Sequence, residues 1–219
     1  MARPRKDSAE ADARTRIVDA FWQLLASGRH ISRVSAGAVA ALAGCNRGTF
    51  YYYFKSMDAL VEEALRELLT DDGQVVDALF RVMVTGDLRV FEGVNLAASL
   101  HRIVVGIGSG VDYKINAAVR SAIMQRWEAA LYASERELSS DACFMVQFEL
   151  SGVMSYLLAM ALSREKGGTE VMRPRPPADL AHGYMEATAE RTLTAVAEAE
   201  GLDAEAAAAK VLASLERPA

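Results

Sequence analysis

The chain has 219 residues, of which 52% are hydrophobic and 24% are charged, and its net charge is −5. This balance excludes an intrinsically disordered chain and supports a sizeable core. Only two cysteines are present, which excludes a disulfide framework, and the shortage of glycine and proline beside abundant alanine, leucine and glutamate favours helices over strands.

The first residues, 1–6, form a basic arm. Its charges suit either a disordered, solvated terminus or an extra phosphate or minor-groove contact. The arm lacks the apolar stretch of a signal peptide, so we expect a cytoplasmic protein. A helix should begin near Asp7 or Ser8 and end at Ser27-Gly28. Its inner stripe would be formed by Ile17, Phe21, Leu24 and Leu25.

Two short helices joined by a tight turn are predicted in the stretch that begins at Ser35. Ser35 should cap the first helix, Gly44 should end it in a left-handed conformation, and Asn46 should cap the second. The second helix would span residues 47–54. Its two phenylalanines, four residues apart, would face inward.

The other faces of this second helix carry an arginine and three tyrosines. Three nearly consecutive tyrosines are too many for so small a core and too apolar for a solvated face. A helix–turn–helix whose second helix enters the major groove of DNA would give them a partner. The distribution of charge agrees with this interpretation. Residues 1–55 have a net charge of +5, which suits DNA phosphates, and the remaining residues have a net charge of −10.

The segment resembles the DNA-binding head of the TetR family of bacterial transcriptional regulators. The spacing of the family pattern is kept without a gap by Ser35, Val39, Ala40, Ala43, Gly44, Cys45, Asn46, Gly48, Thr49, Tyr51, Tyr53, Phe54, Ser56, Met57 and Leu60. Two positions depart from the pattern. Tyr53 replaces a histidine, and Met57 replaces a lysine that in the family meets phosphate, a role that Lys55 could take over.

Specific roles follow for the predicted DNA-binding residues. Arg47, in the first turn, is expected to bind guanine O6 and N7 together. Tyr51 and Tyr52 lie one turn on and could contact thymine methyls or base edges. The resemblance implies phosphate contacts from other side chains. The full predicted set is Ser35, Arg47, Gly48, Thr49, Tyr51, Tyr52, Tyr53 and Lys55.

Helical periodicity continues to the end of the chain and predicts an all-α protein of about nine helices. The helix Ser56–Leu69 would connect a head, residues 1–55, to a ligand-binding and dimerisation body, residues 56–219. Further helices are expected at Val75–Val84, Leu88–Ile107, Ile115–Tyr132, Cys143–Ser163, Asp179–Ala199 and Asp203–Leu215, with a loop at Gly167–Pro177. Cys143–Ser163 is apolar enough to suggest a membrane span, but Gln147 and Glu149 favour a helix at the centre of the body.

The resemblance also implies a homodimer and a small-molecule effector. We expect the two C-terminal helices to form a four-helix bundle with a second copy, and the operator to be a palindrome. Nine methionines would suit an adaptable apolar pocket. Candidate pocket residues, for each of which plain core packing is the alternative, are Phe91, His101, Tyr113, Trp127, Phe148, Met154 and Tyr156.

Enzymatic motifs are missing. The three histidines are scattered, no cysteine or histidine pair has metal-ligand spacing, and Gly106 to Gly110 lacks the strand and lysine of a phosphate loop. The sequence therefore predicts no catalytic site, metal or cofactor. The leading hypothesis is a ligand-responsive transcriptional regulator that binds double-stranded DNA and acts as a repressor. The alternative is a helical small-molecule-binding protein whose head does not read DNA specifically.

Overall fold

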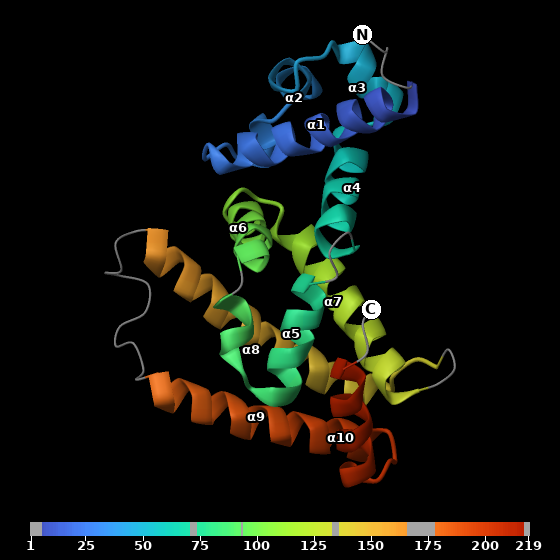
Figure 1. Cartoon of the computed structure of the whole chain (residues 1–219), viewed down its shortest axis with the longest axis vertical. Coiled ribbons are helices and arrows are strands. Elements are labelled where there is room, and N and C mark those ends of the chain that lie inside the picture. Colours follow the sequence, from blue (N-terminus) through green and yellow to red (C-terminus); the bar gives the residue numbers. More distant parts are fainter. Residues whose placement is uncertain (1–5, 71–73, 93, 133–135, 166–177, 217–219) are drawn as a thin grey trace. The chain divides into compact units, whose positions relative to one another are not determined.

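The computed structural model describes residues 6–70, 74–92, 94–132, 136–165 and 178–216. Within these ranges the chain forms ten α-helices and no strand (Figure 1). The predicted all-α fold is therefore confirmed. The α-helices are α1 Lys6–Ala26, α2 Ala36–Leu42, α3 Arg47–Tyr53, α4 Met57–Thr70, α5 Gln74–Thr85, α6 Val94–Gly108, α7 Asp112–Leu131, α8 Ser140–Glu165, α9 Ala178–Ala199 and α10 Ala204–Ala213. Short 3₁₀ helices are η1 Ile31–Arg33, η2 Leu88–Glu92 and η3 Ser214–Glu216.

The chain divides into two compact units. Unit 1 consists of Met1–Asp71 and His101–Asn116, and unit 2 of Asp72–Leu100 and Ala117–Ala219. Unit 1 thus combines α1 to α4 with the corner between α6 and α7. The functional division after residue 55 that the sequence suggests stays a prediction.

The core of unit 1 is built where α1 packs against α2 and α4, and α2 against α3. Large side chains from all four helices are almost fully buried there, namely Ile17, Phe21, Leu25, Val39, Phe50 and Leu60. Because Phe50 is buried, the opposite face of α3 is turned away from the core.

The α6–α7 corner is fastened to the helical head of unit 1. The amide of Ile31 donates to the carbonyl of Ser109 at 2.8 Å. Gly110 has φ +84°, and a Cβ there would overlap the ring of His30, so this close approach requires glycine. Ion pairs add to the attachment, with Lys114 Nζ 2.7 Å from Asp58 Oδ1. The α6–α7 corner is therefore held to the helical head of unit 1 by a backbone hydrogen bond, a close steric contact and an ion pair.

Unit 2 is organised around α5, which packs against α8 and α9. Its side chains Leu79, Phe80, Val82 and Met83 are fully buried. At the end of α5, Gly86 has φ +72°, and a Cβ there would overlap the backbone of Met185 and Glu186. The chain can therefore turn directly against α9 only because this residue is glycine.

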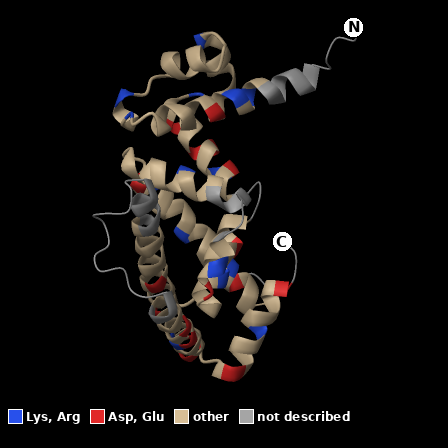
Figure 2. Cartoon of the chain, turned by 60° about the vertical axis from the view of Figure 1, so that its left-hand side comes forward, with Lys and Arg blue, Asp and Glu red and all other residues tan. Residues whose placement is uncertain are grey.

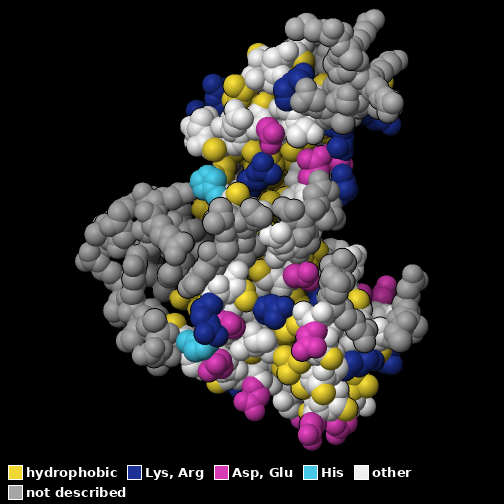
Figure 3. All heavy atoms as spheres, viewed as in Figure 1, with side chains coloured by type: hydrophobic (Ala, Val, Ile, Leu, Met, Phe, Trp, Pro, Cys, Tyr) yellow, Lys and Arg dark blue, Asp and Glu magenta, His cyan; other side chains and the backbone are white. Residues whose placement is uncertain are grey.

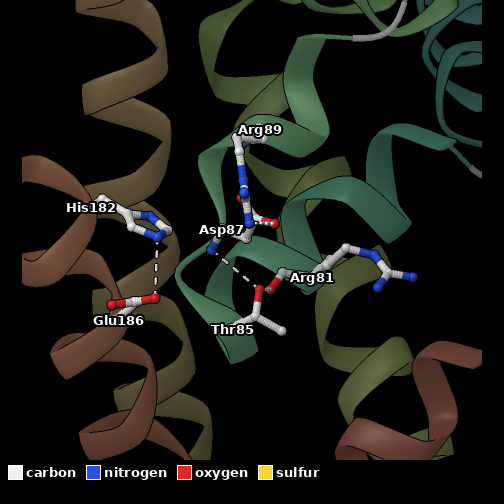
Figure 4. A network of polar contacts seen from close by, with 6 residues as sticks. All are labelled: Arg81, Thr85, Asp87, Arg89, His182 and Glu186. Atoms are coloured by element: carbon white, nitrogen blue, oxygen red, sulfur yellow. Dashed lines mark hydrogen bonds and ion pairs between the residues drawn. The ribbon is translucent and has the colours of Figure 1, made fainter. Parts of the chain in front are cut away.

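A polar network surrounds this turn (Figure 4). The hydroxyl of Thr85 donates to the carbonyl of Arg81 at 2.7 Å and accepts from the amide of Asp87 at 3.2 Å. Arg89 Nε lies 2.8 Å from Asp87 Oδ1, and this hydrogen bond lowers the pKa of Asp87. On the facing helix, His182 Nε2 is 3.1 Å from Glu186 Oε1. The network gives the end of α5 a defined shape.

The 3₁₀ helix η3, the last described turn of the chain, is hydrogen-bonded to arginines of α5 and α7. Arg126 donates to Asp77 Oδ1 at 3.0 Å and to the carbonyl of Ser214 at 2.9 Å, and Arg81 donates to the carbonyl of Leu215 at 3.1 Å. Acidic side chains gather at the opposite end of α10, at the α9–α10 turn (Figure 3), where Glu198, Asp203 and Glu205 are exposed.

Some sequence predictions need correction or fall outside the described residues. The single helix expected at Leu88–Ile107 is wrong, because the structure has two helices there, η2 and α6. The sequence has a glycine between them, and glycine disfavours a continuous helix. The basic arm, apart from Lys6, and the loop Gly167–Pro177 lie outside the described residues. In the part of the chain that the structure describes, no helix is both long and apolar enough to cross a membrane.

Candidate nucleic-acid interface

The turn between α2 and α3 is defined by local hydrogen bonds. The hydroxyl of Ser35 accepts from the amide of Ala38 at 3.2 Å and so caps α2. Gly44, at φ +68°, ends α2, and the amide of Cys45 then reaches back to the carbonyl of Ala40 at 2.9 Å. Asn46 caps α3 by accepting from the amide of Thr49 at 2.8 Å. All three predicted signals are confirmed.

Helix α3 has a buried face and an exposed face. Phe50, within α3, and Phe54, which caps its C-terminus, are buried, and their ring centroids lie 5.9 Å apart. Tyr51 and Tyr52 are 46% and 73% exposed, and Arg47 and Gly48 are also exposed. The helix therefore presents one basic and two aromatic side chains, all able to hydrogen-bond, to the outside.

Arg47 and Tyr51 form a pair on this exposed face. Arg47 Nη2 donates to the hydroxyl of Tyr51 at 3.3 Å, and the guanidinium carbon lies 5.5 Å from the centroid of the tyrosine ring. The hydrogen bond raises the pKa of Arg47, so its charge is secure. Since the pair spans one helical turn, the tyrosine restricts where the guanidinium points.

The other predicted DNA-binding residues take part in local structure as well. Ser35 and Thr49 belong to the caps of α2 and α3. A Cβ at Gly48 would lie 3.1 Å from Asn46 Oδ1, so glycine keeps that cap uncrowded. Tyr53 is half-buried, with its ring 4.9 Å from that of Tyr52, and Lys55 is exposed two residues after the end of α3.

Residues 19–64 match the family model described as bacterial regulatory proteins, tetR family. The match begins within α1 and ends within α4, so it includes the whole of α2, the turn and α3. The head of the chain is of the TetR-family type. The match supports a DNA-binding transcriptional regulator with a helix–turn–helix. Comparison with curated proteins and with solved structures gave no match.

Not all basic residues of the TetR-family head are available for DNA. Arg14 pairs with Glu63 and, at 2.9 Å, with Glu67 of α4, and Arg16 donates to the carbonyl of Ala43 at 3.3 Å. By contrast, Arg29, shortly before η1, and Arg33, the last residue of η1, are exposed. They are not among the predicted DNA-binding residues, although their position shortly before Ser35 is a usable signal. Figure 2 shows the charged residues of the head in colour.

The seven candidate pocket residues are divided between the two units. His101 and Tyr113 belong to unit 1, and both are exposed. The others belong to unit 2, where Phe148 is exposed and the rest are half-buried or buried, namely Phe91, Trp127, Met154 and Tyr156. The structure thus does not bring the seven residues together in one unit, and their role in ligand binding stays a prediction.

Trp127 is notable among them. It is fully buried with its ring at 5.4 Å from that of Phe80, in an edge-to-face arrangement. Its indole Nε1 is buried and has no hydrogen-bond partner in the described structure. An unpaired buried donor costs about 1–3 kcal/mol, which a bound acceptor atom would recover.

Proposed function

We propose that this TetR-family regulator is a repressor that binds a palindromic operator as a homodimer and is released by a small molecule. The observation that carries the proposal is the exposed face of α3, where Arg47, Tyr51 and Tyr52 project from a helix whose other side is fixed by buried Phe50. A helix with this composition fits the major groove of DNA. A protein with this task works in the bacterial cytoplasm.

We assign two kinds of DNA contact. Arg47 has the bidentate geometry for guanine O6 and N7, and its pairing with Tyr51 limits its freedom before binding. Tyr51 and Tyr52 extend the base contacts along the groove. Ser35, Thr49, Tyr53 and Lys55 are assigned to phosphates, with Gly48 allowing close approach. Such phosphate contacts position the helix without specifying sequence.

The proposed effector is an apolar or aromatic molecule that carries a hydrogen-bond acceptor. Trp127 offers a buried donor without a partner, and half-buried Phe91, Met154 and Tyr156 belong to the same unit. Pockets for small ligands are mostly apolar with a few polar groups that fix orientation. Trp127→Phe should keep the packing and weaken the response to such an effector.

Effector binding must favour one of two arrangements of the head, because a ligand shifts an equilibrium only by its differential affinity. Two parts of unit 1 are suited to transmit the change, namely α4 and the α6–α7 corner. The chain passes between the two units three times, once after α4 and once within each of α6 and α7. The corner is hydrogen-bonded to the head through Ile31 and Ser109.

The alternative function is a small-molecule-binding protein whose head does not read DNA. Met57, which stands where the family has a phosphate-binding lysine, is the observation that favours it. A gel shift on DNA from upstream of the protein's own gene, at several salt concentrations, separates the two. We expect a salt-sensitive complex that an excess of unrelated DNA does not displace. No preference over unrelated DNA would support the alternative. Screening metabolites for loss of the complex then tests the effector.

A further inference from the structure

Glu149 is a buried acidic residue on the inner side of α8. It is only 9% exposed, and it lies on the same side of the helix as Val146 and Val153, which are fully buried. Among the described residues, its carboxylate has no hydrogen bond and no ion pair. Glutamate is almost never buried unless it is paired, so this position calls for a functional explanation.

The nearest positive charge does not pair with this carboxylate. Burial raises the pKa of Glu149, and the charge of Arg191 on α9 offsets part of the rise. The guanidinium of Arg191, however, donates to the carbonyl of Ala187 at 3.2 Å and to the hydroxyl of Thr188 at 3.0 Å. Arg191 is thus held by its own helix, and the buried carboxylate of Glu149 lacks the partner that would offset its loss of hydration.

A second buried polar side chain lies at the same level on α9. Helices α8 and α9 run in opposite directions within unit 2 (Figure 1), and the amide of Ser139 donates to Glu200 Oε1 at 2.6 Å, which fixes their register. Ten residues further along α8 and ten back along α9, Glu149 is level with Glu190 and within one turn of Thr192. Thr192 is 8% exposed, and its hydroxyl too has no hydrogen bond among the described residues.

The carboxylate of Glu149 keeps a narrow contact with solvent. In the described part of the chain, the fully enclosed side-chain nitrogen and oxygen atoms without a partner are the indole nitrogens of Trp22 and Trp127. The oxygens of Glu149 are not among them, so the small exposed fraction of this residue includes its polar end. A charged group of a small molecule can therefore reach the carboxylate from outside.

We propose that Glu149 binds the positively charged group of the effector, an ammonium or amidinium ion, with the hydroxyl of Thr192 as a second acceptor. Carboxylate and hydroxyl oxygens both accept hydrogen bonds, which suits a cation that carries N–H donors. A divalent metal ion fits less well, because it needs several oxygen ligands and the described residues contain no group of three or more His, Cys, Asp or Glu that could hold one. The inference rests on the proposed function, to which it adds the charge class of the effector.

This pairing should give the site a strong preference for charge. A cation at Glu149 supplies the partner that the chain itself does not, whereas a neutral group of the same size leaves the carboxylate unpaired. Hydrogen bonds to a charged group are about twice as strong as neutral ones. An ammonium ion should therefore bind ~10- to 100-fold more tightly than the matching alcohol.

Isothermal titration calorimetry of the full chain without DNA tests the preference. The probes are phenylethylammonium, its para-methoxy derivative and tryptammonium, each compared with the alcohol of the same skeleton. In wild type at least one ammonium ion should show the expected preference over its alcohol. Glu149→Gln, which keeps the size of the side chain and removes its charge, should abolish the preference. Thr192→Val should weaken binding of the ammonium ion ~2- to 10-fold.

Glu190→Gln is the matched control, because it removes an exposed carboxylate at the same level of α9 and changes the net charge equally. It should keep the wild-type preference. The proposal is overturned if no ammonium ion binds more tightly than its alcohol, if Glu149→Gln keeps the preference, or if Glu190→Gln loses it to the same extent. Wild-type affinity in Thr192→Val would overturn the role of the hydroxyl.

The same ammonium ion should then weaken the complex with the preferred operator in wild type and in Glu190→Gln, and not in Glu149→Gln. Failure of the calorimetry with intact operator binding would refute the cation site and leave the proposed DNA binding in place. Cation binding by a protein that shows no preference for any operator would have the opposite meaning. The two experiments therefore separate this inference from the proposed function.

Discussion

The guanidinium of Arg47 lies over the ring of Tyr51 and donates to its hydroxyl at 3.3 Å, so the two groups on α3 are ordered by each other before any DNA is present. An arginine that is already oriented loses less conformational entropy when it binds a base. We therefore regard the pair, and not Arg47 alone, as the unit that reads the operator.

Tyr51→Phe tests this pairing, because it keeps the ring and removes the hydroxyl. Affinity for the preferred operator should fall by about 0.5–1.5 kcal/mol, the entropic cost of ordering a long side chain that is no longer oriented before binding. Affinity for scrambled DNA and the free energy of unfolding should not change. Fluorescence anisotropy titrations on both DNAs measure the difference. An equal loss on both would mean that the hydroxyl contacts phosphate.

Lys55 should act on phosphate. It is exposed immediately after α3, so Lys55→Ala should weaken binding to every sequence alike and reduce the slope of log affinity against log salt by about one unit per subunit. Lys55→Arg is the matched control and should retain the slope. A loss confined to the preferred operator would contradict the assignment.

Phe50 should support the fold of the head and not contact DNA. It is fully buried, so Phe50→Ala should lower the free energy of unfolding by about 3–5 kcal/mol. Tyr52→Ala, which removes an exposed ring from the same helix, should leave stability within about 0.5 kcal/mol. Urea denaturation followed by circular dichroism compares them. Equal stability of the two variants would show that the burial of α3 is wrongly assigned.

Glu149 should make stability depend on pH. Burial raises the pKa of its carboxyl above 4.5, and Arg191 offsets part of the rise. In the window between 4.5 and the raised pKa the unfolded chain loses its proton first, so the native state loses stability as pH increases.

Glu149→Gln removes this titration. The variant should be more stable than wild type at pH 7, with the advantage fading as pH falls toward 4.5. Glu190→Gln, at an exposed position on α9, is the control. Denaturation curves across the pH range would contradict the account if Glu149→Gln gave a constant offset or a loss at pH 7.

The sequence predicted the helix–turn–helix well because its signals are local. Ser35, Gly44 and Asn46 act through hydrogen bonds or backbone angles within a few residues. Periodicity likewise identified Phe50 and Phe54 as the inner face of α3. The exposed residues then followed by exclusion.

Contacts between distant segments could not be predicted in this way. Nothing near Ile31 shows that its amide meets Ser109, or that the α6–α7 corner belongs to the same unit as the head. Composition was also misleading for α8. A long apolar run suggested a helix buried on most of its surface, yet Phe144 and Phe148 are exposed. An apolar residue that packs in the core and one that stays exposed look the same in a sequence.

The most direct test of base reading by α3 compares wild type with Arg47→Ala on the preferred operator and on scrambled DNA over a range of salt concentrations. The account predicts a loss of about 1–3 kcal/mol on the operator, little loss on scrambled DNA, and a relaxed sequence preference. Equal losses on both DNAs, with a reduced salt slope, would show that Arg47 contacts phosphate and would contradict the central claim.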